Sequence, residues 1–394
     1  MTTLENAKAL GYTGLTEKIQ AAGLKEYGLY PELFMDKVYQ ANAKEGDVFV
    51  YAGLNNADVD GALLELLRIC PEKVFSGIQV AGMLTGAAAM FLYLPEKETE
   101  LTDALRKTAD EYGVILVNDI INVRETEEDL RMHLVTAADL ADLVDGTYEA
   151  GVYVCTAQDA LKKVPADTKI GDLVSLDGAK AVWLGYQYYT PEEAADLTAA
   201  DAVNGLIRVL SDKECIVAET AKLLLKDRQA SCGRCVFCRE GLIQLEYMQK
   251  EITAARGKAG YLDLTREIGE AMNPSTLCSV GQVSANAALT AITKFPEEFE
   301  AHIKKNKCPA GACGAFVHIY VDPQTCTGCG DCVDVCPAGC IDGKPKFIHM
   351  IDEFECTKCG KCIEVCEEEA IVQTAGKLPK LPNRLVKVGK FKKH

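Results

Sequence analysis

The sequence has a shortage of basic residues. It contains 42 Lys and Arg against 58 Asp and Glu, a formal net charge of −16 at pH 7 over 394 residues. Because a nucleic-acid surface needs clustered Lys and Arg to neutralise phosphates, this balance argues against nucleic acid as a general partner. Hydrophobic residues make up 48% and charged residues 25%, an ordinary composition for a folded chain of about two to four domains.

Signals for export or membrane insertion are also missing. The N-terminal MTTLENAKALGYTG has no basic region followed by an apolar run, so we expect no export signal. One stretch, residues 74–94, is free of charge and long enough to span a bilayer. Gly77, Gly82 and Gly86 interrupt it and Pro95 ends it, which favours a buried helix followed by a buried strand over a membrane span.

Cysteine is abundant, with 18 residues, but its arrangement does not indicate disulfides. Most of the cysteines occur at short spacings typical of metal ligands, in a chain for which we expect no export signal. We therefore predict a reducing, cytoplasmic location. The chemistry of open clusters further suggests an anaerobic or microaerobic cell.

The first part of the chain reads as an α/β domain. Runs typical of buried strands occur at 48–54, 87–94 and 114–123, and charged helical stretches such as 99–113 separate them. Strands that alternate with helices favour a mainly parallel sheet.

The remaining chain changes character several times. Shorter β-rich runs predict a small β-grasp-like unit, a helical pattern follows, and after Lys307 the chain becomes rich in Cys, Gly and Pro. We predict a multidomain α+β protein in which a helical bundle holds one [4Fe–4S] cluster and a ferredoxin-like domain holds two. The predicted segments are 1–148, 149–200, 201–304, 305–321, 322–375 and a basic tail, 376–394.

The clearest internal repeat lies between residues 326 and 371. CTGCGDCVDVCPAGCI matches CTKCGKCIEVCEEEAI, 30 residues later, at 8 of 16 positions. In each copy the C-x2-C-x2-C-x3-C run wraps three thiolates around one [4Fe–4S] cluster, and its fourth Cys reaches the other cluster. The predicted ligands are Cys326, Cys329, Cys332 and Cys366 for cluster A, and Cys356, Cys359, Cys362 and Cys336 for cluster B. Two zinc sites are the alternative, which the duplicated triple spacing disfavours.

A third compact set lies in SCGRCVFCREG. Cys232, Cys235 and Cys238 repeat the C-x2-C-x2-C spacing, and a cubane needs a fourth ligand. Cys278, in PSTLCSVG within the helical region, is the candidate that completes cluster C. A zinc site or a redox-active dithiol is the alternative.

A fourth set mixes thiols with an imidazole. His302, Cys308 and Cys313 lie at H-x5-C-P-x3-C spacing, and this ligand chemistry suits Zn²⁺ in a closed structural site. Cys215 is the candidate for the missing fourth ligand, because it lies at the start of the helical domain and is otherwise unassigned. Free thiols beside a surface histidine are the alternative.

Three cysteines and the tail remain. We expect Cys70 and Cys155 to be core residues, and Cys340, which aligns with Ala370, to be a packed thiol that is not a ligand. The tail from residue 376 carries seven Lys or Arg and no acid, so it is either an extended partner-binding segment or a solvated end.

Three of these motifs together resemble one family. SCGRCVFCREG at 231–241, TLCSVG at 276–281 and FPEEFEAHIKKNKCPAGAC at 295–313 resemble the NADH-binding flavoprotein subunit of respiratory complex I and of electron-bifurcating hydrogenases. The hydrogenase version adds a two-cluster ferredoxin after CPAGxC, in the order found here. The resemblance is specific from about residue 205 to 375 and faint before that, although 149–190 is similar to a shortened form of the family's β-grasp domain.

The N-terminal domain departs from this family. Its members bind FMN through a loop of the form GRGGAGFPTG, where the backbone approaches the phosphate. This chain has ELFMDKVYQANAKEGD at 32–47, NNADVDG replaces the acidic EGEPG segment at 55–61, and the GAGAYICGEE segment is absent. The departures predict a degenerate flavin domain that binds neither FMN nor NADH.

The expected function is electron relay. We predict an iron–sulfur subunit of a larger soluble oxidoreductase that passes single electrons between a flavin or metal catalytic subunit and another partner, such as ferredoxin. No side chains form an evident acid/base or nucleophilic set, so a non-catalytic role is expected. Two alternatives remain open: a flavin-containing NAD(P)H dehydrogenase subunit with a rebuilt FMN site, and a free-standing carrier or redox sensor.

Overall fold

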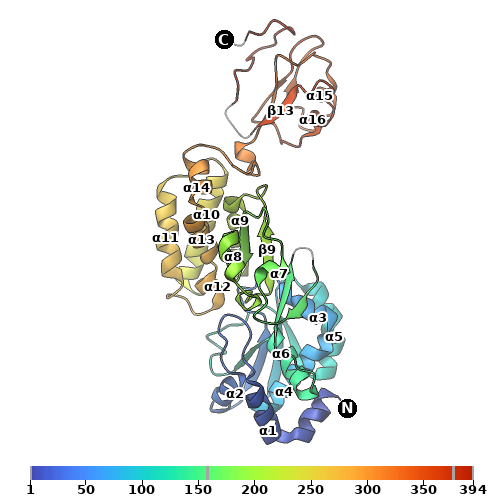
Figure 1. Ribbon diagram of the computed structural model, residues 1–394, viewed down its shortest axis with the longest axis vertical. Coiled ribbons are helices and arrows are strands. Elements are labelled where there is room, and N and C mark those ends of the chain that lie inside the picture. The colour runs from blue at the N-terminus through green and yellow to red at the C-terminus, as the bar shows by residue number, and fades with distance from the viewer. Residues whose placement is uncertain (1, 157–158, 375–377, 393–394) are drawn as a thin grey trace. The chain divides into compact units, whose positions relative to one another are not determined.

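The computed structural model describes residues 2–156, 159–374 and 378–392 (Figure 1). The boundary predicted at 375–376 lies outside these residues. The chain forms two compact units, each assembled from separate stretches of sequence. Unit 1 comprises Met1–Ser211, Lys222–Leu245 and Thr265–Lys294, and unit 2 comprises Asp212–Ala221, Glu246–Leu264 and Phe295–His394.

Unit 1 begins with a four-stranded parallel sheet of order β3-β2-β1-β4. Its strands are β1 (Phe49–Gly53), β2 (Ala89–Leu94), β3 (Val114–Asn118) and β4 (Leu130–His133). The predicted parallel sheet and the strands expected at 48–54 and 87–94 are confirmed. The run at 114–123 is a strand only as far as Asn118, and β4 was not predicted.

Helices connect and cover these strands. They are α1 (Thr3–Ala22), α2 (Phe34–Asn42), η1 (Ala62–Leu64), α3 (Glu65–Ile69), α4 (Pro71–Thr85), α5 (Thr99–Tyr112) and α6 (Leu134–Asp145). The charge-free stretch at 74–94 is therefore a helix followed by a strand, as predicted. In the described part of the chain, no helix combines the length and apolar character that a membrane crossing requires.

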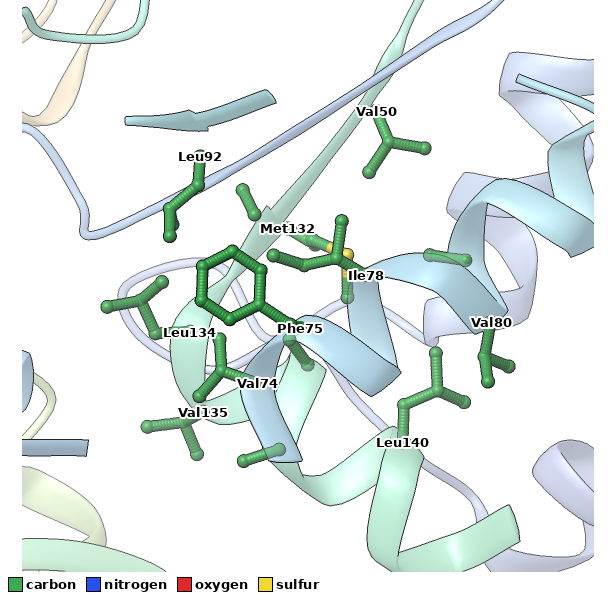
Figure 2. Close-up of a cluster of buried hydrophobic side chains, with 14 of the residues drawn as sticks. Val50, Val74, Phe75, Ile78, Val80, Leu92, Met132, Leu134, Val135 and Leu140 are labelled. Atoms are coloured by element: carbon green, nitrogen blue, oxygen red, sulfur yellow. The ribbon is translucent and has the colours of Figure 1, made fainter. Parts of the chain in front are cut away.

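The core lies between the sheet and helices α4 and α6 (Figure 2). Val50 and Leu92 project from the sheet toward Phe75 and Ile78 of α4, and all four are fully buried. The two helices pack closely because Gly77 has no side chain, and a Cβ there would lie 1.8 Å from the carbonyl oxygen of Ala137. A substitution at Gly77 would therefore force the helices apart.

The opposite face of the sheet carries a row of half-exposed aromatic side chains. The rings of Tyr51 and Phe91 stack 5.2 Å apart, with Phe49 and Tyr93 at either side. Parallel sheets usually have both faces buried. The second face of this sheet departs from that rule, because its four aromatic side chains remain half-exposed.

A second sheet in unit 1 has five strands in the order β6-β5-β9-β7-β8. Its elements are β5 (Val152–Thr156), β6 (Lys162–Val164), α7 (Ile170–Leu173), β7 (Ala181–Leu184), β8 (Gln187–Tyr189), α8 (Pro191–Asp196), η2 (Ala199–Asp201) and β9 (Leu206–Leu210). Gly185 and Tyr186 both have positive φ, which gives the tight hairpin between β7 and β8. Strand β9 falls beyond residue 200, where we placed the end of this segment.

A helical stretch follows, in agreement with the predicted pattern. Its helices are α9 (Ile216–Ala230), α10 (Val236–Thr253), α11 (Gly260–Met272), α12 (Ser279–Val283), α13 (Asn286–Lys294) and α14 (Pro296–Ile303). These helices carry or flank the cysteines of the two predicted upstream metal sites.

The cysteine repeat in unit 2 folds as two equivalent halves. Its elements are η3 (Gly314–Phe316), β10 (His318–Val321), α15 (Asp331–Asp334), β11 (Ile341–Asp342), β12 (Met350–Ile351), α16 (Lys361–Glu364) and β13 (Ile371–Thr374). Strand β10 pairs with β13 and β11 pairs with β12, both antiparallel. Gly330 and Gly360 stand in the same left-handed conformation before the two short helices. The repeat in sequence is therefore a repeat in structure.

Candidate metal centres

Four side chains of unit 2 converge in a buried group, which we call the Cys₃His group: Cys215, His302, Cys308 and Cys313. All four are buried, and their ligand atoms lie within 4.8 Å of one another. The Sγ of Cys215 is 3.4 Å from Nε2 of His302 and 3.5 Å from Sγ of Cys313. A tetrahedral ion with Zn–S bonds of about 2.3 Å holds two sulfurs about 3.8 Å apart, so the spacing is close to that of a zinc site.

The surroundings of His302 fix its orientation. Its Nδ1 lies 2.7 Å from the carbonyl oxygen of Glu298, which leaves Nε2 directed at the thiols. The ring of Phe316 meets the imidazole edge-on at 4.9 Å. Such support of the second ring nitrogen is typical of a metal-ligating histidine.

Electrostatics in the Cys₃His group favour a bound cation. Hydrogen bonds with Cys215 and Cys313 lower the pKa of Cys308. Hydrogen bonds with Cys308 and Cys313, together with burial, raise the pKa of Cys215. Burial lowers the pKa of His302, but hydrogen bonds with Cys215 and Cys308 outweigh it and raise that pKa to about 10. Three buried thiols cannot all ionise without a counter-charge, and a divalent metal supplies one.

The cysteines predicted for cluster C come together in unit 1. Cys232, Cys235 and Cys238 lie around the start of α10, and Cys278 stands directly before α12. Burial raises the pKa of Cys238 to about 11, and the charges of the other three cysteines act in the same direction, which reflects their proximity. Only Cys238 is fully buried, and Cys232 is exposed.

Polar groups lie close to the thiols of Cys278 and Cys238. Burial raises the pKa of the Cys278 thiol, and the nearby amides of Gly281 and Val280 and the side chain of Asn56 partly offset this rise. Ser231 Oγ lies 3.4 Å from Sγ of Cys238. Hydrogen bonds to ligand sulfurs are a standard means of stabilising a reduced iron–sulfur cluster.

The eight cysteines predicted as ligands in the repeat line two separate cavities. Cys326, Cys329, Cys332 and Cys366 line one cavity, together with His349, Asp331 and Glu368. Cys336, Cys356, Cys359 and Cys362 line the other. Each cavity thus combines three cysteines of one copy with the last cysteine of the other copy, which is the crossed arrangement of a two-cluster ferredoxin.

Two neighbours of these cavities were not predicted to take part. Cys340 is buried as expected, but it lines the second of these cavities, with its Sγ 3.5 Å from that of Cys336. His349 lies beside the first cavity, with Nδ1 3.9 Å from Sγ of Cys326. Neither residue belongs to the repeated spacing, so the pattern gave no signal for them. Cys70 and Cys155, expected in the core, are half-buried.

Unit 1 also contains two cavities at the carboxyl edge of its parallel sheet. Both include Asn55 and Asn56, which follow β1. The first extends to His133 and to Cys278, and the second extends to Cys232. Parallel sheets commonly bind ligands at this edge, where the strand order reverses. The sequence pattern did not reveal these cavities, because β4 was not predicted.

A buried hydrogen-bond network lies beside these cavities. Asp58 accepts a hydrogen bond from the hydroxyl of Tyr186, and its other oxygen lies 3.4 Å from Nε2 of His133 and 3.1 Å from the amide of Asn55. Nearby, the amide of His133 donates to Glu26, which also forms an ion pair with Lys37. These contacts occupy Asp58 of the NNADVDG segment and the nearby Glu26.

Two stretches of the chain match models of iron–sulfur-binding families. Residues 220–302 match the NADH-ubiquinone oxidoreductase-F iron–sulfur binding region, and residues 318–368 match a 4Fe–4S dicluster domain. The resemblance to the NADH-binding flavoprotein subunits is thereby confirmed.

Two proteins with similar sequences are subunits of hydrogenases or NADH-quinone oxidoreductases. NADP-reducing hydrogenase subunit HndC of Solidesulfovibrio fructosivorans is 35% identical over 146 residues, which cover 37% of this chain and 30% of the relative. An NADH-quinone oxidoreductase subunit of Rhizobium meliloti is 31% identical over 115 residues, 29% of this chain and 27% of the relative. The alignments thus span less than a third of these relatives, which are themselves subunits of larger oxidoreductases.

The fold similarity extends further than the sequence similarity. A subunit in the crystal structure of an NAD⁺-reducing [NiFe]-hydrogenase in the H₂-reduced state superposes with a TM-score of 0.66. It covers 77% of this chain and 65% of the hydrogenase chain, at 19% identity. The similarity of fold thus extends over 77% of this chain at only 19% sequence identity.

Proposed function

We propose that this chain is an electron-transfer subunit of a larger oxidoreductase complex and carries three [4Fe–4S] clusters. The convergence of three separate four-cysteine sets carries the proposal. Iron–sulfur clusters of this kind supply one-electron oxidation and reduction. The partners would be a flavin or metal catalytic subunit on one side and a further electron carrier on the other.

Each donor set suits a cluster better than it suits a disulfide or isolated thiols. The sets of clusters A and B interleave two copies of a triple spacing, and in the set of cluster C the hydroxyl of Ser231 lies within hydrogen-bond distance of Cys238. Cys329 and Cys359 are exposed. Cluster edges close to the surface suit exchange of electrons with other proteins.

The Cys₃His group would hold a structural Zn²⁺. It offers four protein ligands, all buried, and such closed sites hold zinc without catalytic exchange. Because the group joins the beginning of α9 to the segment that precedes β10, the ion would brace the connection to the cysteine repeat.

A second candidate function, a flavin-containing dehydrogenase subunit, is favoured by the cavities of unit 1. The first cavity contains Lys37 and Arg131, which could meet a phosphate, and reaches Cys278. Against this, Glu26 and Lys37 are paired with each other, and Asp58 is engaged by Tyr186 and His133. The loss of the glycine-rich loop removes the usual phosphate cradle, so we favour a relay without FMN or NADH.

Metal and flavin analysis of the anaerobically purified protein tests the proposal. Three clusters require about twelve iron and twelve sulfide per chain, and the Cys₃His group adds about one zinc. Reduction should give an electron paramagnetic resonance signal from each type of cluster, and heat-released flavin should be below stoichiometric amounts.

Other results would redirect the assignment. Stoichiometric flavin that is reduced by NADH or NADPH would establish the second candidate. About eight iron per chain would remove cluster C from the relay. Migration of the native protein as a single 42.7 kDa chain, without partner subunits, would instead support a free-standing carrier or sensor.

A further inference from the structure

The basic tail folds back onto the cysteine repeat of unit 2. The amide of Ile348 donates to the carbonyl of Val386 at 2.9 Å, and the amide of Val388 donates to the carbonyl of Lys346 at 3.2 Å. These bonds frame an antiparallel bridge between Phe347 and Lys387. Apolar residues of the tail, Val386 and Phe391, pack against the core of the repeat. The described part of the tail is therefore attached rather than free.

This attachment lies against the loop that presents cluster A. The amide of Lys346 donates to the carbonyl of Gly328 at 3.1 Å, and Gly328 stands between the ligands Cys326 and Cys329. A Cβ on Gly328 would lie 2.7 Å from the carbonyl oxygen of Phe347, so only glycine permits this approach. The same loop carries Cys329, which is exposed.

The attached segments form a strip of positive charge on an acidic chain. Its basic residues are all exposed, and among the described residues none of them forms an ion pair. They are Lys344, Lys346, Arg384, Lys387, Lys390 and Lys392, and we call them the basic strip. The neighbouring cavity is lined by two acids, Asp331 and Glu368. The positive charge in this part of the surface therefore comes from the basic strip and not from the cavity.

We propose that the basic strip is the docking surface for a small acidic electron-carrier protein that exchanges electrons with cluster A. Unpaired cations in a chain of net charge −16 attract an acidic partner to one place while the rest of the surface repels it. In the exchange, the reduced carrier loses one electron and cluster A gains it, and no bond is formed or broken. The inference rests on the proposed electron-relay function.

Charge reversal within the strip tests the inference. The variant combines Arg384→Glu, Lys387→Glu and Lys390→Glu, and the matched control combines Lys8→Glu, Lys25→Glu and Lys107→Glu at exposed positions of unit 1. The probe is a reduced, small acidic ferredoxin mixed anaerobically with the full chain at low ionic strength. We expect ferredoxin to reduce the strip variant at least about tenfold more slowly than the wild type. The rate of reduction of the strip variant should also lose most of its dependence on salt, whereas the rate of the control should change much less.

A reductant that does not depend on charge distinguishes a failure of the docking surface from a failure of the electron-relay function. Photoreduction with deazaflavin should reduce the clusters of all three proteins equally, and its failure in the wild type would overturn the proposed relay function itself. Equal rates with ferredoxin in the strip variant and the control would overturn the docking surface. A charge-neutral variant with Gln at the same three positions should give an intermediate rate, and its equality with the wild type would also contradict the inference.

A phosphate-bearing partner is tested with the same proteins. In one outcome the wild type binds anionic phospholipid vesicles or RNA and the strip variant does not, while the rate of reduction by ferredoxin is unchanged. That result would assign the basic strip to a phosphate-bearing partner and would overturn the proposal of a protein carrier.

Discussion

The Cys₃His group and the cysteines of cluster C each bring four ligands together, but they are enclosed very differently. Exposed fractions in the first group are 1% for Cys215, 2% for His302, 0% for Cys308 and 4% for Cys313. In the second group Cys238 is buried, Cys235 and Cys278 are half-buried, and Cys232 is exposed. Similar ligand chemistry thus occurs once in a sealed setting and once in an open one.

The difference indicates different roles for the two groups. A sealed group with its imidazole fixed by Glu298 and Phe316 suits an ion that holds chain segments together. An open group beside two cavities suits a centre that exchanges electrons with a neighbour. The comparison therefore predicts that damage to the first group destabilises the fold and damage to the second mainly abolishes transfer.

The largest effect is expected from Cys308→Ser in the sealed group. Loss of this ligand leaves two buried thiols and an imidazole without their cation, and structural zinc contributes directly to folding. We expect loss of the zinc and a fall of about 10 °C or more in the unfolding midpoint, measured by metal analysis and calorimetry. Cys155→Ser, at a half-buried cysteine outside all the sets, is the control. A zinc-free protein with an unchanged midpoint would refute a structural role.

A smaller effect on stability is expected from Cys235→Ser in the open group. The iron content should fall from about twelve to about eight per chain because one cluster is lost. The unfolding midpoint should change by less than in Cys308→Ser, since Cys235 is only half-buried. Iron analysis, electron paramagnetic resonance and calorimetry on the same sample check this. A loss of stability equal to that of Cys308→Ser would erase the distinction between the two groups.

The smallest effect concerns Asp227, a buried carboxyl on α9 near the open group. Burial raises its pKa to about 8, partly offset by a hydrogen bond with Ser284. The folded state therefore keeps a proton that the unfolded state releases above about pH 4, so stability should fall as the pH rises from about 4 to 8, by at most about 1.4 kcal/mol per unit. Asp227→Asn should flatten this slope in urea unfolding at pH 5 to 8. An unchanged slope would show that Asp227 does not titrate in this way.

The ligand sets were the most predictable part of the protein. Cysteines that one loop presents to a cluster recur at short spacings, so the three cysteine triplets could be recognised directly, whereas Cys278 was proposed from the need for a fourth ligand. Cys215 was predicted by elimination, and the structure places it within 3.5 Å of Cys313, 98 residues away. The strands β1 and β2 were equally predictable from the sequence because they are continuous apolar runs.

Features that depend on packing were not predictable from the pattern. Strand β4 is short and half polar, so neither it nor the cavities at its end gave a periodic signal. The pairing of Asp58 with Tyr186 joins residues 128 positions apart through the folding of two sheets. The position of the tail likewise depends on hydrogen bonds between backbone groups, which any sequence can form. Charge alone could not distinguish a solvated tail from an attached one.

The crossed ligand sets that we propose for the cysteine repeat imply an order of assembly. As the chain emerges during synthesis, the ligands of cluster C are complete at Cys278 and those of the Cys₃His group at Cys313. Cluster B is complete at Cys362, and cluster A must wait for Cys366, 88 residues after Cys278. At about 5–20 residues per second this interval lasts roughly 4 to 18 s. Cluster A would therefore be the last set to be completed, but the longest wait for a partner falls on Cys215, which leaves the ribosome 98 residues before Cys313.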